Sequence, residues 1–287
     1  MSIVITGATG QLGRHVVEAL LERNVPAEEI VATGRSIEKL ADFAARGVQV
    51  KSMDYDDPAS VAAALTGARK VLLISSSEVG KNRPAQHRTV IEAAKAEGVD
   101  LLAYTSNANA DANKTLLGKD HKATEAILAE AGVPFTLLRN GYYFENWTDQ
   151  IEGTLVQGAL VGSAGDGRVN AATRADYAEA AATVLLADDQ AGKVYELGGD
   201  VAFTVTDLAA EISAAAGKTI VYRDLPAPEY VAMLVGVGVP EAFAEILADS
   251  DLGLARGDLL VAGEDLRTLI GRPTTTLTEA VRSAVSA

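Results

Sequence analysis

Three glycines near the start of the chain have the spacing of a phosphate-binding turn. They lie in the segment Gly7–Gly13, which follows a short apolar run and leads into a helical pattern. In such a turn the first glycine permits the bend, the second lets the backbone approach a pyrophosphate, and the third allows helix and strand to pack closely. The helix N-terminus then faces the anion. We therefore predict a dinucleotide site formed by Gly7, Ala8, Thr9, Gly10, Gln11, Leu12 and Gly13.

The residue after the second apolar run favours one nicotinamide cofactor. Sites that select NAD place an Asp or Glu there, which binds the ribose 2′-hydroxyl. Here the run ends in Gly34 and Arg35. A guanidinium presents a rigid fork that matches phosphate. We expect Arg35 to pair with a 2′-phosphate, so that NADPH is preferred over NADH; the alternative is that Arg35 only caps the next helix in solvent.

The tyrosine and lysine, four residues apart, that short-chain dehydrogenases use in catalysis are absent from the sequence. None of the eight tyrosines has a lysine four positions later. This disfavours alcohol dehydrogenation and sugar epimerisation of the usual kind. His121 and Tyr143 are the candidate catalytic residues, because a histidine titrates near neutral pH and could donate a proton. His121 shares a helical face with Glu125, and the alternative is a structural His121 bonded to Glu125 or to the cofactor ribose.

Strand-like and helical segments alternate through the first half of the chain. We predict strands at Ser2–Thr6, Ile30–Thr33, Val48–Met53, Lys70–Ile74, Leu101–Thr105 and Phe135–Leu138. Helices are predicted between them, at Gln11–Arg23, Glu38–Arg46, 58–65, Pro84–Glu97 and His121–Ala131. Such alternation predicts an α/β fold, a Rossmann-type doubly wound parallel sheet with helices on both faces.

The second half of the chain is less regular. It contains helical patterns at Asp176–Leu186 and Asp207–Ala216, strand-like runs at Lys193–Leu197 and Ile220–Arg223, and a capping box at Thr276–Glu279. We expect residues 1–140 to form an NAD(P)-binding Rossmann domain to which residues 174–200 return. Residues 141–173 and 201–287 would form a smaller C-terminal substrate-binding α/β region.

Composition excludes several classes of function. The 287 residues carry 25 basic and 39 acidic side chains, a net charge of −14, which disfavours binding to nucleic acid. Cysteine is absent and the three histidines lack metal-ligand spacing, so we expect no metal. No apolar run is long enough to span a membrane. The N-terminus lacks the basic start of a signal peptide, so we expect a cytoplasmic protein.

Several longer motifs resemble one family. They are GATGQLG, ISSSEVG (74–80), AQHRTVIEAAK (85–95), AYTS (103–106), TLLRNGYYFEN (136–146), ATRADYA (172–178), KVYELGGD (193–200) and LIGRPTTTL (269–277). Together they resemble the NmrA-like group of atypical short-chain dehydrogenases, and within it the bacterial NAD(P)H:quinone oxidoreductases, with the triphenylmethane reductases next. The resemblance runs nearly end to end. It implies a monomer or weak homodimer that binds NADPH without flavin or metal.

The resemblance also implies roles for particular residues. Gly7–Gly13 would hold the pyrophosphate and Arg35 the 2′-phosphate, while Asp54 and Tyr55 would border the adenine. The remaining cofactor contacts would come from Ser75, Ser76, Ser77, Asn140, Gly141, Tyr142 and Tyr143. The substrate contacts would come from Ser77, Asn107, Tyr142, Phe144 and Trp147. The aromatic residues are either part of the core or a wall on which a flat substrate stacks, and Asn107–Gly118 matches no motif of the family.

The resulting hypothesis is an NADPH-dependent reductase that transfers hydride directly to a small quinone-like molecule in one two-electron step. A quinone is strongly electrophilic, so the reaction needs little help from an acid, which is consistent with the missing tyrosine–lysine pair. The cofactor supplies the chemistry and the protein supplies the positioning. Two alternatives stay open. One is a reductase of another conjugated acceptor, such as a triarylmethane dye, an imine or an enone, and the other is a non-catalytic regulator that senses dinucleotides.

Overall fold

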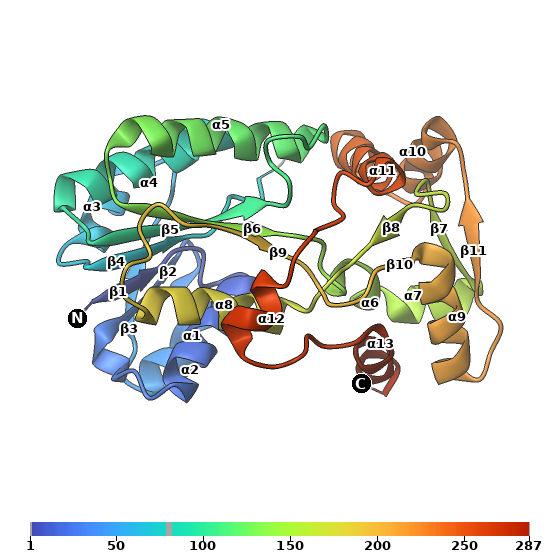
Figure 1. The fold of residues 1–287 in the computed structure, drawn as a ribbon, viewed down its shortest axis with the longest axis horizontal. Coiled ribbons are helices and arrows are strands. Elements are labelled where there is room, and N and C mark those ends of the chain that lie inside the picture. Colours follow the sequence, from blue (N-terminus) through green and yellow to red (C-terminus); the bar gives the residue numbers. More distant parts are fainter. Residues whose placement is uncertain (1, 79–81, 287) are drawn as a thin grey trace. The chain divides into compact units, whose positions relative to one another are not determined.

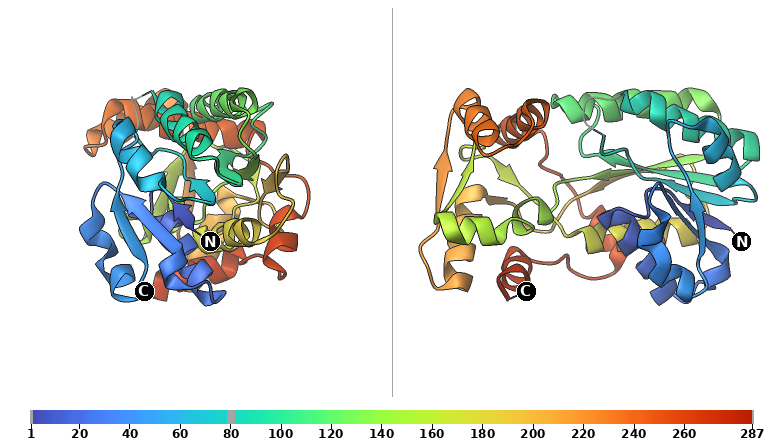
Figure 2. Two further views of the ribbon diagram at one scale, coloured as in Figure 1. Left: turned by 90° about the vertical axis from the view of Figure 1, so that its left-hand side faces the viewer. Right: turned by 180° about the vertical axis from the view of Figure 1, so that it is seen from behind.

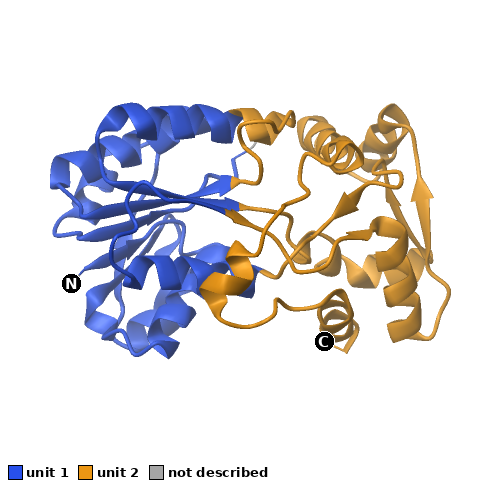
Figure 3. Cartoon of the chain, viewed as in Figure 1, with its two compact units in different colours: residues 1–106, 120–139, 174–195 blue, residues 107–119, 140–173, 196–287 orange. Residues whose placement is uncertain are grey.

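The chain folds into two compact units, each assembled from three separate stretches of sequence. A computed structural model describes residues 2–78 and 82–286. Within it, unit 1 comprises residues 1–106, 120–139 and 174–195, and unit 2 comprises residues 107–119, 140–173 and 196–287 (Figure 3). Our division from sequence placed residues 107–119 in the first domain, whereas here they belong to unit 2.

Unit 1 is built around a seven-stranded sheet with the order β3-β2-β1-β4-β5-β6-β9. The strands are β1 (Ile3–Ile5), β2 (Ile30–Gly34), β3 (Gln49–Ser52), β4 (Lys70–Leu73), β5 (Leu101–Asn107), β6 (Phe135–Asn140) and β9 (Val194–Leu197). The pairs β3–β2, β2–β1, β1–β4 and β4–β5 are parallel. This confirms the predicted doubly wound Rossmann-type sheet, whose first six strands follow the order of dinucleotide-binding folds.

Helices cover both faces of this sheet. On one face lie α3 (Pro58–Leu65), α4 (Arg83–Glu97) and α5 (Leu116–Ala131), and on the other lie α1 (Gln11–Glu22), α2 (Ala41–Ala45) and α8 (Arg174–Leu186) (Figures 1 and 2). Short 3₁₀ turns, η1 (Ala27–Glu29) and η2 (Ile37–Leu40), flank β2. The helix predicted at Glu38–Arg46 is thus split between η2 and α2.

Local sequence signals account for where several helices begin. Asp57 caps α3 by accepting a hydrogen bond from the backbone N–H of Ala59 at 3.0 Å, and Pro58 occupies the first helical position. Asn82 caps α4 in the same way, through Ala85 N–H at 3.1 Å. Such caps satisfy backbone donors that the helix itself leaves without partners.

Unit 2 has two small sheets and its own core. Strand β7 (Ala159–Gly162) pairs in parallel with β11 (Val221–Asp224), and β8 (Arg168–Val169) pairs antiparallel with β10 (Phe203–Thr204). The helices are α6 (Glu145–Thr148), α7 (Ile151–Gln157), α9 (Val205–Ala216), α10 (Ala227–Gly236), α11 (Glu241–Arg256), α12 (Asp265–Ile270) and α13 (Leu277–Ser286). Helix α13 begins at the predicted capping box, where Thr276 and Glu279 exchange side-chain and backbone hydrogen bonds. None of the helices in the described part of the chain is long and apolar enough to cross a membrane.

Candidate functional site

The glycine turn after β1 has the geometry that a bound pyrophosphate requires. Gly7 has φ +60°, a conformation that favours glycine. Gly10 is the N-cap of α1, and because it has no side chain it neither caps the helix nor blocks the approach to its N-terminus. The first turn of α1 contains no acidic residue, so it places no carboxylate of its own at the positive end of the helix dipole. The residues fit a dinucleotide, as the spacing predicted.

Two further glycines allow the strands and the helix to approach this turn. A Cβ on Gly13 would lie 2.6 Å from the Gly7 carbonyl oxygen and 2.7 Å from Ala8 Cα. A Cβ on Gly34, at the end of β2, would lie 2.5 Å from Thr9 Cγ2. Gly34 was not among our predicted site residues, although its place at the end of β2 beside Arg35 is a usable signal.

Arg35 follows β2 directly, and its side chain is 56% exposed. Its guanidinium forms an ion pair with Glu78, which lies beyond β4. The pair is within unit 1, 43 residues apart in sequence. Arg35 is thus a surface cation at the expected position, and it already has an anionic partner.

Tyr55 connects the turn to the ends of β1 and β4. Its hydroxyl donates to the Ile74 carbonyl oxygen at 2.8 Å and also contacts the Thr6 hydroxyl. Burial raises the pKa of Tyr55, so the phenol stays neutral. The neighbouring Asp54 uses its carboxylate to accept from the backbone N–H of Asp56 at 3.0 Å. Both residues follow β3 and so lie at the end of the sheet where ligands bind in this fold.

The serines after β4 are held by buried side chains of helix α4. The backbone N–H of Ser76 donates to His87 Nε2 at 2.9 Å, and its carbonyl oxygen accepts from Arg83 Nε at 2.7 Å. Ser75 N–H donates to the Thr105 hydroxyl at 2.9 Å, and Ser77 is exposed. The peptide of Ser76 is therefore fixed on both sides. Val79 and Gly80 of the ISSSEVG motif lie outside the described residues.

His121 lies in a buried network of unit 1. Its Nε2 is 3.3 Å from Arg83 Nη2, and its Nδ1 is 2.8 Å from the Tyr104 hydroxyl. A guanidinium only donates, so Nε2 accepts and Nδ1 carries the proton. Burial, together with the charge of Arg83, holds the pKa of His121 well below its usual range. The imidazole is therefore neutral at physiological pH, with both nitrogens engaged.

Glu125, which we placed beside His121 on the helical face, makes its contacts elsewhere. Its carboxylate pairs with the guanidinium of Arg139 in β6 through Nε at 3.0 Å and Nη2 at 2.6 Å, and it accepts from the Ser106 hydroxyl at 2.5 Å. Both charged side chains are about 10% exposed. The Glu125 carboxylate therefore joins α5 to β5 and β6.

The segment after β6 carries the predicted aromatic residues of unit 2. Asn140 Nδ2 donates to the Tyr143 hydroxyl at 3.2 Å, and its own Oδ1 is buried with no hydrogen-bond partner among the described residues. The rings of Tyr142 and Trp147 pack with centroids 4.6 Å apart. Gly141 N–H donates to the Leu197 carbonyl oxygen at 2.8 Å. Within the described part of the chain, Asn140 Oδ1 is therefore an unsatisfied acceptor that has almost no accessible surface through which a ligand could reach it.

Two of the predicted substrate residues are engaged in packing or polar contacts within unit 2. Phe144 is 2% exposed and stacks on Phe203 with centroids 5.6 Å apart. This places Phe144 in the core and not on a wall, because its ring has almost no exposed surface. Asn107 accepts a hydrogen bond from Asn113 at the start of the stretch that matched no motif.

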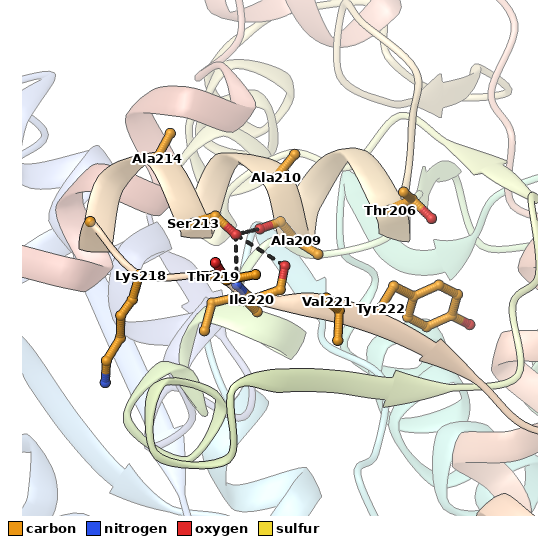
Figure 4. A pocket seen from close by; sticks show the side chains of 11 residues that line it. Thr206, Ala209, Ala210, Ser213, Ala214, Lys218, Thr219, Ile220, Val221 and Tyr222 are labelled. Atoms are coloured by element: carbon orange, nitrogen blue, oxygen red, sulfur yellow. Dashed lines mark hydrogen bonds between the residues drawn. The ribbon is translucent and has the colours of Figure 1, made fainter.

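A groove of about 780 Å³ runs between α9 and β11 (Figure 4). Its central hydroxyl, that of Ser213, donates to the carbonyl oxygens of Ala209 and Ile220 and accepts from Ile220 N–H at 2.8 Å. None of the predicted site residues lines this groove. The Ser213 hydroxyl has all its hydrogen-bond partners in the backbone, so it helps to hold α9 against the start of β11.

Several residues that shape the site were not among our predicted site residues. Arg83 and His87 bind the backbone of Ser76 in the loop after β4, and Glu78 pairs with Arg35 after β2. Arg83 and His87 meet partners such as His121 and Thr124 that are 37 or 38 residues away. No local pattern signals such pairs. Among the described residues, no group of three or more acidic or imidazole side chains could hold a metal ion.

Comparison with known proteins points to one family. The model of an NAD(P)H-binding family matches residues 7–188. Quinone oxidoreductase 2 of Escherichia coli is 50% identical over 97% of both chains. A crystal structure of an E. coli NADPH-dependent quinone oxidoreductase with NADPH superposes with a TM-score of 0.94, at 49% identity over 98% of this chain and 99% of the other. Citrobacter triphenylmethane reductase superposes with a TM-score of 0.93, at 37% identity over the full length of both chains.

These matches extend over both units, and the family model covers the glycine turn, Arg35 and the loop after β4. They agree with the Rossmann-type sheet and with the resemblance drawn from the sequence motifs. By this identity and coverage, the chain belongs to the NmrA-like family of NAD(P)H-binding proteins.

Proposed function

We propose that this protein is an NADPH-dependent reductase that transfers hydride to a quinone. The observation that carries the proposal is the 50% identity, over 97% of each chain, to a quinone oxidoreductase. A likeness of that extent covers the substrate region as well as the dinucleotide region. The expected product is a hydroquinone, formed in a single two-electron step.

Residues of unit 1 bind the cofactor in this proposal. The turn at Gly7–Gly13 and the N-terminus of α1 hold the pyrophosphate, and Arg35 binds the 2′-phosphate. Tyr55 and Asp54 border the adenine. The serines Ser75–Ser77 contact the ribose and nicotinamide, and Arg83 and His87 fix the backbone of Ser76. Contacts of Asn140–Tyr143 with the nicotinamide stay predictions.

When bound, NADPH supplies the hydride, and the chain's own residues orient the reacting rings. His121 is a positioning residue in this scheme, because its neutral ring donates to Tyr104 and accepts from Arg83. Tyr143 or solvent delivers the proton that the quinone oxygen needs. A delocalised hydroquinone anion reduces the demand for an acid, which is consistent with the absence of a tyrosine–lysine pair.

One other function has specific support. A triphenylmethane reductase at 37% identity favours reduction of another conjugated acceptor, such as a triarylmethane dye, an imine or an enone. The dinucleotide-sensing regulator stays an alternative from the sequence alone, because the fungal NmrA-like relative at 28% identity is itself named an oxidoreductase. A monomer or weak homodimer in the cytoplasm stays a prediction.

Steady-state oxidation of NADPH with a panel of acceptors tests these functions. The panel contains benzoquinone, larger quinones, a triarylmethane dye, an imine and an enone, each with a control lacking protein. We expect turnover with quinones at a kcat/KM above that with every other acceptor. A higher kcat/KM with the dye than with any quinone would show that another conjugated acceptor, and not a quinone, is the preferred substrate. Tight NADPH binding with no turnover of any acceptor would favour the regulator.

A further inference from the structure

The cation that we assign to the 2′-phosphate is already paired with a carboxylate. Arg35 Nη1 donates to Glu78 Oε1, and the Glu78 side chain is 20% exposed, compared with 56% for Arg35. Glu78 follows the serines after β4, so it lies at the same end of the sheet as Arg35 after β2. Any anion that binds this guanidinium has to displace the carboxylate or share the cation with it.

Glu78 is held in this position by neighbours of its own. Gln86, a buried residue of α4, donates from Nε2 to Glu78 Oε2 at 3.2 Å. The same amide donates to Asp56 Oδ1 at 3.0 Å, which fixes its orientation. The backbone N–H of Glu78 donates to the Ser76 hydroxyl at 3.3 Å. The carboxylate is therefore positioned by contacts on both sides, unlike a side chain that moves freely in solvent.

We propose that Glu78 is a specificity-determining residue that weakens binding of the 2′-phosphate and so narrows the preference for NADPH over NADH. This inference rests on the proposed function. A phosphate beside Arg35 is repelled by the carboxylate, and both anions compete for the Arg35 guanidinium. NADH carries a 2′-hydroxyl instead, which can donate to a carboxylate, as it does in sites that select NAD. Glu78 thus supplies, from the loop after β4, the acid that is missing after β2.

The test is the variant Glu78→Gln, which keeps the size of the side chain and removes its charge. Dissociation constants are measured at one salt concentration for NADPH, NADH, adenosine 2′,5′-bisphosphate and adenosine 5′-monophosphate. Half-exposed ion pairs have modest energies, so we expect the dissociation constants of NADPH and the bisphosphate to fall roughly two- to fivefold. Those of NADH and the monophosphate should stay the same or rise.

Two controls separate this effect from a change in net charge. Glu18→Gln removes a carboxylate from the exposed Glu18–Arg46 pair of unit 1 and should leave every constant unchanged. In an Arg35→Ala background, Glu78→Gln should favour NADPH less than it does with Arg35 present, because the contested guanidinium is gone and only the direct effects of the carboxylate remain. A circular dichroism spectrum and melting temperature like those of the wild type establish that each variant is folded.

Several results would overturn the inference. Weaker or unchanged NADPH binding by Glu78→Gln would show that the carboxylate orients Arg35 or has no influence on the phosphate. Equal tightening of NADPH and NADH would show a general electrostatic effect. These outcomes leave the proposed function intact if the wild type binds NADPH. Failure of the wild type to bind NADPH or the bisphosphate would overturn the proposed function together with the inference.

Discussion

The close approach at Gly13 leads to a prediction that separates folding from cofactor binding. In Gly13→Ala the new Cβ would lie 2.6 Å from the Gly7 carbonyl oxygen and 2.7 Å from Ala8 Cα. Both are backbone atoms, so no side chain can rotate away. Overpacking of this kind costs about 1–3 kcal/mol, whereas alanine gains about 1 kcal/mol over glycine within a helix. Because both contacts are with backbone, the cost should lie in the upper part of that range, at about 2–3 kcal/mol, so we expect a net loss of about 1–2 kcal/mol in the free energy of unfolding.

Gly10→Ala is the matched variant, three residues earlier in the same turn. Gly10 has φ −88° and ψ 169°, which alanine adopts freely. Among the described residues, the one atom that a Cβ there would approach closely is the Gly7 carbonyl oxygen, at 3.3 Å. The stability should change by less than about 1 kcal/mol. The added methyl group nevertheless occupies the space through which the backbone approaches a pyrophosphate, so the NADPH dissociation constant should rise about tenfold or more.

Thermal unfolding without ligand and fluorescence titration with NADPH measure the two effects. A loss of 1–2 kcal/mol corresponds to a melting temperature roughly 2–8 °C lower for a chain of this size. Wild-type stability of Gly13→Ala would refute the reasoning from backbone contact. NADPH affinity close to wild type in Gly10→Ala would remove the turn from the cofactor site.

Three further predictions concern charged or titratable side chains. Arg35→Ala should raise the KM for NADPH about tenfold or more while changing that for NADH little, because a charge-assisted bond to phosphate is lost; equal effects on both cofactors would remove Arg35 from the 2′-phosphate. His121→Ala should lower kcat with quinones by less than about tenfold, the lower limit of the range for a lost general acid, but should also lower the melting temperature, because Arg83 and Tyr104 lose a buried partner. A thousandfold loss with unchanged NADPH binding would make His121 the proton donor. Burial raises the pKa of Asp251 in unit 2 to about 6, and the charge of Asp224 adds to the rise. The folded protein therefore binds a proton at Asp251 more tightly than the unfolded chain does. The stability that this proton contributes at low pH is lost as the pH rises through about 6. The free energy of unfolding of Asp251→Asn, relative to that of the wild type, should therefore rise by on the order of 2 kcal/mol between pH 4 and 7. Denaturant titrations at each pH measure it, and a difference between the two proteins that does not change with pH would contradict the raised pKa.

Local signals in the sequence predicted the elements of unit 1 well. The helix after Asp57 begins where its capping residue and Pro58 indicated, and it ends at Leu65 as predicted. The glycine turn lies between β1 and α1 as its spacing required. These features depend on residues a few positions apart, whose preferences act before any distant contact forms.

Contacts between distant residues could not be predicted in this way. Glu125 faces Arg139 because β6 passes beside α5, although its helical spacing to His121 was the only pattern that the sequence offered. The pairing of β7 with β11 joins strands about 60 residues apart, each only 4 residues long. Short strands carry too few alternating positions to reveal their partners.

The order of segments in unit 1 has a consequence for synthesis on the ribosome. Helix α8 packs on α1, where Arg23 Nη2 donates to the Thr183 hydroxyl at 3.2 Å, and Lys70 Nζ donates to the Leu185 carbonyl oxygen at 2.7 Å. Helix α8 is translated about 150 residues after α1, which takes roughly 8–30 s at the usual rates of elongation. During that time the part of this face that α8 covers is exposed to chaperones and to aggregation, although α1 and α2 already lie on the same face. A fragment that ends before Arg174 keeps the whole glycine turn and still leaves that part of the face open.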